Sequence, residues 1–278
     1  MSGWVVFVAL VAVIGCTAAA ESRLWSNCGN RHIPSNGKEE LNAFSRIVGG
    51  QEAKANSWGQ QCSLIFYGSH QCGGSLIRNA AGVWFFVTAA HCTEGVRLIH
   101  FSARCGTHDR NQGKVITFNK LIEHEEYNSR TFDYDIAVLQ VATPLEQSNK
   151  IWPICLPSRD VNDGEKGIVT GWGAIYQDGP ISNKLLQVVV PVKPDNTCNQ
   201  RYPFQITNRM YCAGYTNGQK DSCQADSGGG LNYLRNNKWE LGGIVSWGYG
   251  CAQNYNPGVY ANARVLLSWL EDKIRDIA

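Results

Sequence analysis

The sequence predicts an all-β protein, and three features of the chain indicate this fold class. Short runs rich in β-branched and aromatic residues recur along it, separated by clusters of Gly, Asn, Asp and Pro. Apolar residues make up 44% of the 278 residues, which is enough for a sizeable core. A helical spacing of apolar residues is clear only in the last stretch of the chain. These patterns fit a β-sandwich as well as a β-barrel.

The first twenty residues, 1–20, are expected to be a signal peptide. Residues 4–15 are an apolar core, and Ala18-Ala19-Ala20 is a small-residue cleavage site before Glu21. The run is too short and wrongly flanked for a transmembrane helix. A bacterial lipid-attachment site at residues 13–16 is a weaker alternative. Because no other apolar run is long enough to span a bilayer, we expect a secreted, extracellular protein without a membrane partner.

Residues 21–46 are polar and lack periodicity, so we interpret them as a propeptide that precedes a mature domain at 47–278. The strands expected in that domain cover residues 61–67, 83–88, 114–118, 136–141, 168–172, 185–192, 239–247 and 258–262. Near the C-terminus, six apolar residues fall near one face of a predicted helix, with charged residues mostly opposite: Val265, Leu266, Trp269, Leu270, Ile274 and Ile277.

Charge and cysteine usage exclude some classes of function. The formal net charge is +2 and no Lys/Arg run occurs, so nothing points to a nucleic-acid partner. Of the eleven cysteines, Cys16 leaves with the signal peptide. Ten remain, and an even number in an oxidising compartment predicts disulfides. A metal site is the competing interpretation, but no Cys-x-x-Cys or His-x3-His cluster supports it. We therefore expect no metal and no cofactor.

The segment 221–230, Asp-Ser-Cys-Gln-Ala-Asp-Ser-Gly-Gly-Gly, contains a candidate nucleophile, Ser227. By itself such a Gly-rich stretch is more often a plain loop. An alcohol needs a base to accept its proton and donors to hold the oxyanion that follows. The candidate base is His91, in Val-Thr-Ala-Ala-His-Cys (87–92), and Asp135, in Asp-Tyr-Asp-Ile-Ala-Val-Leu (133–139), would orient it. The chain order is His, Asp, Ser.

Five motifs occur in order along the chain: Ile-Val-Gly-Gly (47–50), Thr-Ala-Ala-His-Cys (88–92), Asp-Ile-Ala-Val-Leu (135–139), Thr-Gly-Trp-Gly (170–173) and Asp-Ser-Gly-Gly (226–229). With them, the chain from Arg46 onwards resembles the chymotrypsin–trypsin family of serine proteases. The resemblance implies two six-stranded antiparallel β-barrels with the active site between them, and a C-terminal α-helix that we expect to pack on the second barrel. His91 and Asp135 would come from the first barrel and Ser227 from the second.

The resemblance also implies a specificity pocket. Asp221 matches its floor, Gly248 and Gly258 match its walls, and Ser222 and Tyr202 match the trypsin pattern. A carboxylate at the bottom of an open pocket pairs with Arg or Lys, so cleavage after these residues is expected. Partners would be protein or peptide substrates and protein protease inhibitors, and the enzyme would be a monomer. Digestive, venom, clotting and immune roles all fit.

The segment Arg46-Ile47-Val48-Gly49-Gly50 resembles the activation site of the family. Cleavage after Arg46 would free the amine of Ile47, which could turn inward and pair with Asp226. Because a buried carboxylate without a partner is costly, the new amine could shape the oxyanion loop. The residue cleaved is of the type the enzyme should prefer, so it could activate itself.

The sequence by itself does not choose among pairings of ten cysteines. The resemblance implies Cys72–Cys92, Cys198–Cys212 and Cys223–Cys251. Cys28 and Cys155 match a chymotrypsin-type tether that keeps the propeptide attached after cleavage. Cys62 and Cys105 are not usual family positions, and we pair them by elimination.

Three residues depart from the family pattern. Ala225 stands where the family has Gly, at the amide that forms the oxyanion hole together with that of Ser227, and costs about 1 kcal/mol if the position needs a positive φ. Gly230 replaces the usual Pro, and Thr107 replaces the Glu of calcium-binding trypsins, which predicts no calcium site. Ala225 and Gly230 leave open a catalytically weak homologue that acts as a binding or cofactor protein. Chymotrypsin- or elastase-type specificity is a separate alternative.

The other titratable residues that we considered are expected to have structural roles. Asp133, two residues before Asp135, is predicted to be a solvated loop carboxylate. The same bland interpretation, that of satisfied core residues, holds for the remaining histidines: His32, His70, His100, His108 and His124.

Overall fold

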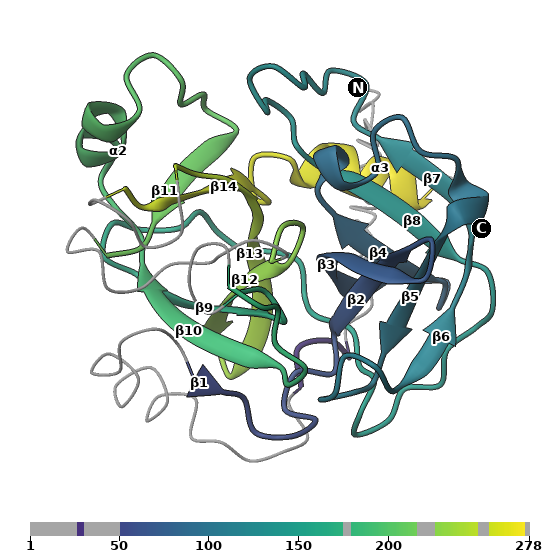
Figure 1. The fold of residues 1–278 in the computed structure, drawn as a ribbon. Coiled ribbons are helices and arrows are strands. Elements are labelled where there is room, and N and C mark those ends of the chain that lie inside the picture. Colours follow the sequence, from purple (N-terminus) through teal and green to yellow (C-terminus); the bar gives the residue numbers. More distant parts are fainter. Residues whose placement is uncertain (1–26, 31–50, 175–178, 216–225, 250–255, 276–278) are drawn as a thin grey trace, which may run out of the picture.

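The computed structural model describes residues 27–30, 51–174, 179–215, 226–249 and 256–275, and its strands form two antiparallel sheets lying side by side (Figure 1). One sheet contains β2 (Gln61–Phe66), β3 (Ser69–Arg78), β4 (Trp84–Thr88), β5 (Phe101–Cys105), β6 (Lys114–Ile116), β7 (Phe118–Glu123) and β8 (Ala137–Val141). The other contains β1 (Gln51–Glu52), β9 (Lys166–Gly171), β10 (Leu186–Pro191), β11 (Met210–Ala213), β12 (Gly230–Arg235), β13 (Lys238–Trp247) and β14 (Gly258–Asn262). The helical elements are the 3₁₀ turns η2 (Ala90–Cys92) and η3 (Leu98–His100) and the α-helices α2 (Asp195–Arg201) and α3 (Leu267–Arg275).

The first sheet closes on itself. Its strand order is β6-β5-β2-β3-β4-β8-β7, so β6 and β7 lie at opposite ends of the order. In the chain, however, only Thr117 separates them. The sheet must therefore curl until its two edges meet, and β6 and β7 act as one interrupted strand of a six-stranded barrel.

The second sheet has the order β1-β10-β9-β12-β13-β14-β11. An isolated antiparallel bridge between Val192 and Ala213 joins the end of β10 to β11, which closes a ring of six strands. The seventh strand, β1, adds to this ring by pairing Gln51 with Gln187 of β10. The two six-stranded barrels expected from the sequence are thus confirmed, with the short β1 as an addition to the second.

Buried side chains fix the two barrels against each other. Trp58, just before β2, donates its indole N–H to the Gln187 side chain of β10 at 2.7 Å. The Thr170 hydroxyl on β9 donates to the Gln61 side chain on β2 at 2.9 Å. Both pairs are fully buried, so breaking either would leave polar groups without water. These contacts make a defined junction between the barrels.

The C-terminal helix α3 packs on the first barrel, and the prediction that it would pack on the second was wrong. Asn79, between β3 and β4, donates its amide to the Ile274 carbonyl at 3.0 Å. Glu125, after β7, accepts from the Trp269 indole at 2.7 Å and pairs with Lys273 at 2.5 Å. Figure 1 shows α3 crossing from the end of β14 to the side of β7 and β8. The helix therefore ties the end of the second barrel to the first.

The apolar face predicted for this helix is partly confirmed. Leu266, Leu270 and Ile274 are buried, but Val265 is 45% exposed. Val265 precedes the first helical residue, so the helical period does not apply to it. Ile277 lies outside the described residues. Neither α2 nor α3, the two α-helices of the described part of the chain, is long and apolar enough to cross a membrane.

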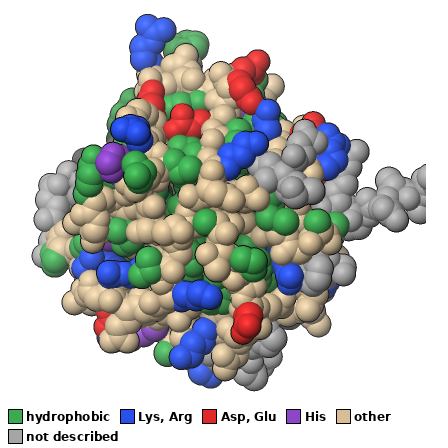
Figure 2. Space-filling view, turned by 90° about the vertical axis from the view of Figure 1, so that its right-hand side faces the viewer, with side chains coloured by type: hydrophobic (Ala, Val, Ile, Leu, Met, Phe, Trp, Pro, Cys, Tyr) green, Lys and Arg blue, Asp and Glu red, His purple; other side chains and the backbone are tan. Residues whose placement is uncertain are grey.

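The face over the first barrel carries acidic and basic side chains among scattered hydrophobic ones (Figure 2). On its described part, neither charge dominates. This mixed surface agrees with the small net charge of the sequence.

Candidate active site

His91 lies at the end of a rigid path through the first barrel. Strand β4 is buried along its whole length, and Ala89 and Ala90, which follow it, are fully buried. The chain then makes the single turn η2, which presents His91 at the barrel surface with its side chain 19% exposed. The Cys72–Cys92 disulfide binds this turn to β3. The backbone is therefore fixed on both sides of His91.

Asp135 is buried and orients that imidazole. It lies two residues before β8, and its carboxylate accepts from the His91 backbone N–H at 2.9 Å. The second carboxylate oxygen lies 2.8 Å from His91 Nδ1 and 2.5 Å from the Ser246 hydroxyl, which donates to it. The three donors to these two oxygens fix the orientation of the buried carboxylate. With Nδ1 directed at Asp135, the Nε2 atom is left on the opposite side of the ring.

Ser227 lies on the segment of the second barrel that faces this turn. Its carbonyl accepts from the Gly73 N–H at 2.8 Å, and the Gly73 carbonyl accepts from the Thr88 hydroxyl at 2.9 Å. Thr88 is the last residue of β4, three residues before His91. The two segments therefore meet across the junction of the barrels. Among the described residues, no hydrogen bond joins the Ser227 hydroxyl to the His91 ring.

Asp226, next to Ser227, points into the second barrel. Its Oδ1 accepts from the Gly173 backbone N–H at 2.8 Å. A Cβ at Gly171 would lie 1.8 Å from the same oxygen, so only glycine allows this approach. Two glycines of the Thr-Gly-Trp-Gly motif at 170–173 thus hold the Asp226 side chain, one by leaving room for it and one by a backbone hydrogen bond. The sequence did not indicate this role for the motif.

Three of the predicted pocket residues lie together. The Tyr202 hydroxyl is buried and donates to the Pro257 carbonyl at 2.6 Å, directly before Gly258. A Cβ at Gly248 would lie 3.8 Å from both Gly258 Cα and the Tyr202 hydroxyl. The glycine pair and the tyrosine thus border the same space. The other predicted residues of the pocket, oxyanion loop and activation site lie outside the described residues: Arg46, Ile47, Asp221, Ser222, Cys223, Ala225 and Cys251.

Comparison with known proteins decides the family, because the model of the trypsin family matches residues 47–270. The chain belongs to the trypsin family of serine proteases. It is 39% identical over 229 residues to Trypsin-1 of Salmo salar, which covers 81% of this chain and 89% of that protein. It is 37% identical over 267 residues to Transmembrane protease serine 5 of Homo sapiens and 36% identical over 251 residues to Transmembrane protease serine 9 of Rattus norvegicus. These matches cover 90% and 88% of this chain, but only 57% and 23% of the two transmembrane relatives.

Four disulfides occur among the described residues of this trypsin-family chain: Cys28–Cys155, Cys62–Cys105, Cys72–Cys92 and Cys198–Cys212. Cys62 and Cys105 are directly opposite each other on the paired strands β2 and β5. One cluster of possible metal ligands, Cys72, His91 and Cys92, lies in the described part of the chain. Its two sulfurs are joined to each other, which removes both thiolates as ligands.

Asp133 is not the solvated carboxylate that the sequence suggested. It accepts from the Arg209 guanidinium through both oxygens and from the Thr207 hydroxyl at 2.7 Å. Burial raises the pKa of Asp133, but the hydrogen bonds from Arg209 and Thr207 outweigh it and hold the pKa below its usual value. No sequence pattern pointed to this pair, because 76 positions separate its members.

Structural roles are found for the histidines that were considered besides His91. His70 is hydrogen-bonded to the Ser63 hydroxyl at 2.7 Å, and His108 to Glu52 at 2.7 Å. His124 is stacked between Tyr134 and Trp269, and His100 packs against Tyr67. His32 lies outside the described residues.

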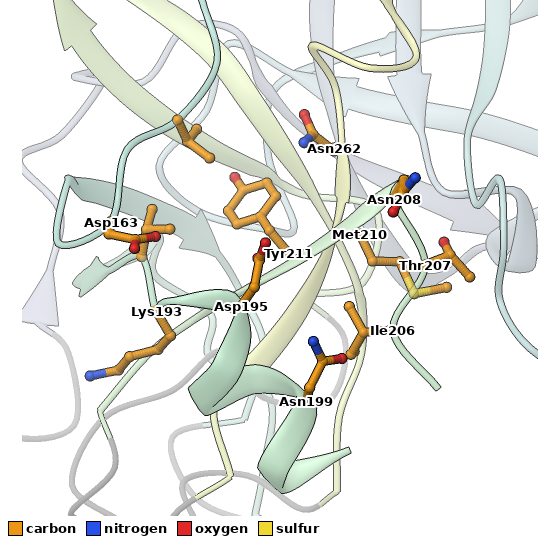
Figure 3. Close-up of a pocket in the computed structure, with 12 residues that line it drawn as sticks. Asp163, Lys193, Asp195, Asn199, Ile206, Thr207, Asn208, Met210, Tyr211 and Asn262 are labelled. Carbon is orange, nitrogen blue, oxygen red and sulfur yellow. The ribbon is translucent and has the colours of Figure 1, made fainter. Parts of the chain in front are cut away.

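A separate cavity of about 320 Å³ lies beside α2 and β11. None of the predicted catalytic residues lines it. Figure 3 shows Lys193 extending away from the other lining side chains, and Asn199 of α2 beside Ile206. Burial lowers the pKa of Lys193. The lining mixes amides, carboxylates and aliphatic groups, and we assign no chemistry to it.

Proposed function

We propose that this chain is a secreted serine endopeptidase, made as a zymogen, that cleaves after Arg or Lys by a Ser-His-Asp mechanism. Ser227 attacks the substrate carbonyl while His91 Nε2 accepts the hydroxyl proton. The backbone N–H groups of Ala225 and Ser227 hold the resulting oxyanion. His91 then gives its proton to the leaving amine, and an acyl-enzyme forms. Water, activated by His91, hydrolyses that ester and restores Ser227.

One observation carries this proposal: the buried Asp135 contacts both the backbone and the ring of His91. The imidazolium formed during proton transfer would lie next to a buried negative charge. In such surroundings the attraction is far stronger than in water. The Ser246 hydroxyl fixes the same carboxylate from the second barrel, which adds to the rigidity of the pair.

Specificity for Arg and Lys is proposed through Asp221. Support comes from the wall residues Gly248 and Gly258 and the buried Tyr202, which border one space; among the described residues, only Gly258 Cα and the Tyr202 hydroxyl would come within 4 Å of a Cβ at Gly248. A long basic side chain in that space would need a counter-charge. Asp221 supplies one, with Ser222 as a hydrogen-bonding neighbour.

Activation is proposed to follow cleavage after Arg46, between the propeptide 21–46 and the protease domain 47–278. The freed Ile47 amine would pair with Asp226, whose carboxylate already lies against Gly173 beside Ser227. The propeptide would stay attached through Cys28–Cys155. Gly29 supports this tether, because it donates to Pro153 at 2.8 Å and accepts from Trp239 at 3.0 Å.

The remaining parts of the proposal concern the whole protein. Removal of the signal peptide 1–20 would release it outside the cell as a monomer. Proteins, peptides and protein protease inhibitors would be its partners. Since several relatives are named transmembrane proteases, secretion needs a direct test by fractionation of expressing cells.

The test of the mechanism is to cleave the zymogen after Arg46 and to measure turnover of Arg, Lys, Phe and Leu esters. Ser227→Ala or His91→Ala should lower kcat by about 10⁴-fold, and the double variant should be little worse. Asp221→Ser should abolish most of the preference for Arg and Lys. Near-normal turnover by Ser227→Ala would rule out the mechanism. A Ser227-dependent enzyme that is equally fast on Tyr and Arg esters would leave the mechanism standing and exclude the specificity.

A further inference from the structure

The loop that carries Asp135 has an unfavourable backbone. Phe132 and Tyr134 have φ angles of 57° and 56°, in the left-handed region that residues other than glycine rarely adopt. Such a conformation costs about 1–2 kcal/mol per residue. It persists only where the surroundings hold it in place. Asp133 lies between the two strained residues, so whatever binds its side chain holds the strained turn.

What binds Asp133 comes from the other barrel. Arg209 lies directly before β11, and its backbone carbonyl accepts from the Asn262 N–H at 2.7 Å, which fixes its position. Its guanidinium donates hydrogen bonds to both oxygens of Asp133, with Nε at 3.0 Å from Oδ1. Thr207, on the same segment, adds its hydroxyl bond to Oδ1. The side chains of Arg209 and Asp133 are only 26% and 15% exposed, so water screens the pair weakly.

A stack of planar groups extends the same contact. The Arg209 guanidinium lies over the Tyr134 ring, 4.6 Å from its centroid. Tyr134 stacks on His124 at 4.4 Å, and His124 stacks on Trp269 of α3 at 4.8 Å. The strained turn thus packs through these stacked groups against Arg209 of the second barrel on one side and the C-terminal helix on the other.

Phe132 of this turn and Asp135, which follows it, both contact His91. The Phe132 ring meets the imidazole edge-to-face with centroids 5.6 Å apart. Asp135 follows Tyr134 directly and holds Nδ1 of the same imidazole at 2.8 Å. A shift of the turn would therefore move both groups that touch the ring.

We propose that Arg209 is a positioning residue for the active site: from the second barrel it clamps the strained turn 132–134 and thereby holds Asp135 and Phe132 against His91. Arg209 does not touch the reacting atoms itself. The proposal rests on the proposed function, because the imidazole must be the catalytic base for its position to affect turnover.

The chain offers a matched control. Lys184, which leads into β10, pairs with Asp109 of the first barrel at 3.3 Å. This pair also bridges the barrels, but its residues contact neither the 132–135 turn nor His91. A loss of activity caused only by weaker contact between the barrels would appear in Lys184→Ala as well as in Arg209→Ala.

The experiment measures kcat and KM of the activated enzyme on a single-residue Arg ester, with active sites counted by titration. Such a substrate is too small to report contacts beyond the specificity pocket. Arg209→Ala should lower kcat about tenfold and leave KM within twofold, whereas Lys184→Ala should change kcat less than twofold. Asp133→Ala should match Arg209→Ala, and the double variant should be no worse than either. Arg209→Lys should recover part of the loss, because an ammonium reaches one oxygen but cannot form the fork.

Equal kcat in Arg209→Ala and Lys184→Ala, or additive losses in the double variant, would overturn the proposal. If Arg209→Ala does not fold, Asp133→Asn tests the same contact with little change of shape. A wild type without Ser227-dependent turnover would refute the proposed function instead. Proton NMR then tests the clamp separately: the low-field Nδ1 proton of His91 should shift or broaden in Arg209→Ala and stay unchanged in Lys184→Ala. An unchanged signal in both would refute the clamp.

Discussion

Breaking the Cys62–Cys105 disulfide should cost the first barrel a large part of its stability. Both residues are fully buried, and they face each other on paired strands with Cα atoms 4.5 Å apart. A disulfide stabilises mainly by restricting the unfolded chain, more so for longer loops. The bond spans 43 residues, but Cys72–Cys92 already shortens that path. The remaining closed loop has about 24 residues, which corresponds to about 3.4 kcal/mol at 25 °C.

The double variant Cys62→Ala/Cys105→Ala tests this value by urea unfolding followed with tryptophan fluorescence. Alanine is preferred to serine because a buried hydroxyl would add its own penalty. Ser227→Ala serves as the background in both proteins, which prevents self-digestion. The loss of two buried sulfurs adds about 1 kcal/mol or more, so the free energy of unfolding should fall by about 4–5 kcal/mol. A fall below about 1 kcal/mol would refute the argument that this bond restricts the unfolded chain.

Three further substitutions follow from close contacts. Gly29→Ala should displace the propeptide tether, because φ is 67° there and a Cβ would lie 2.5 Å from the Trp239 carbonyl; faster proteolysis of 27–30 would show it, and unchanged proteolysis would contradict it. Asn79→Ala should lower the free energy of unfolding by about 1–3 kcal/mol, since a buried amide links α3 to the first barrel, and an unchanged urea midpoint would count against this link. Gly171→Ala should affect kcat more strongly than the free energy of unfolding, because a Cβ would displace Asp226 beside Ser227. A lower free energy of unfolding with a normal kcat would contradict this prediction.

The sequence allowed the family and most of the strands to be predicted, because strand runs and motifs are local patterns. Six of the fourteen strands in the described part of the chain were missed: β1, β3, β5, β7, β11 and β12. In β3, the central Gly73 and Gly74 interrupt the run and suggest a turn. Helix α2 was missed because its seven residues are mostly polar and show no apolar period.

Contacts between distant segments could not be predicted in the same way. The period of the last segment indicated which face of α3 would be buried, but not which barrel would cover it. The Asp133–Arg209 pair joins a loop of the first barrel to the start of β11, and nothing near either residue signals the other. The left-handed backbone on both sides of Asp133 could not be predicted either, since neither Phe132 nor Tyr134 is of a type that favours such backbone.

The attachment of α3 should weaken stepwise as the pH falls. Burial lowers the pKa of His124 from its ordinary value of 6.5, so the folded state favours the neutral ring. A hydrogen bond from Lys273 lowers the pKa of Glu125 to about 2, and one from the Trp269 indole contributes. Both groups titrate below their unfolded values. Their stabilisation is therefore complete at neutral pH and is lost as the pH falls, below about 6.5 for His124 and from about 4.5 towards 2 for Glu125.

The Trp269 indole N–H, which donates to Glu125 at 2.7 Å, provides the measurement. Its NMR signal should titrate with a midpoint well below 4.5, the ordinary pKa of a glutamate. In Lys273→Ala that midpoint should rise, and in Glu125→Gln this step should disappear. Because the Glu125 side chain is 57% exposed, water screens the interaction, and we expect it to contribute at most about 1 kcal/mol. A wild-type midpoint near 4.5 that Lys273→Ala leaves unchanged would mean that Lys273 and Trp269 do not hold this carboxylate, and that α3 is attached by its apolar face alone.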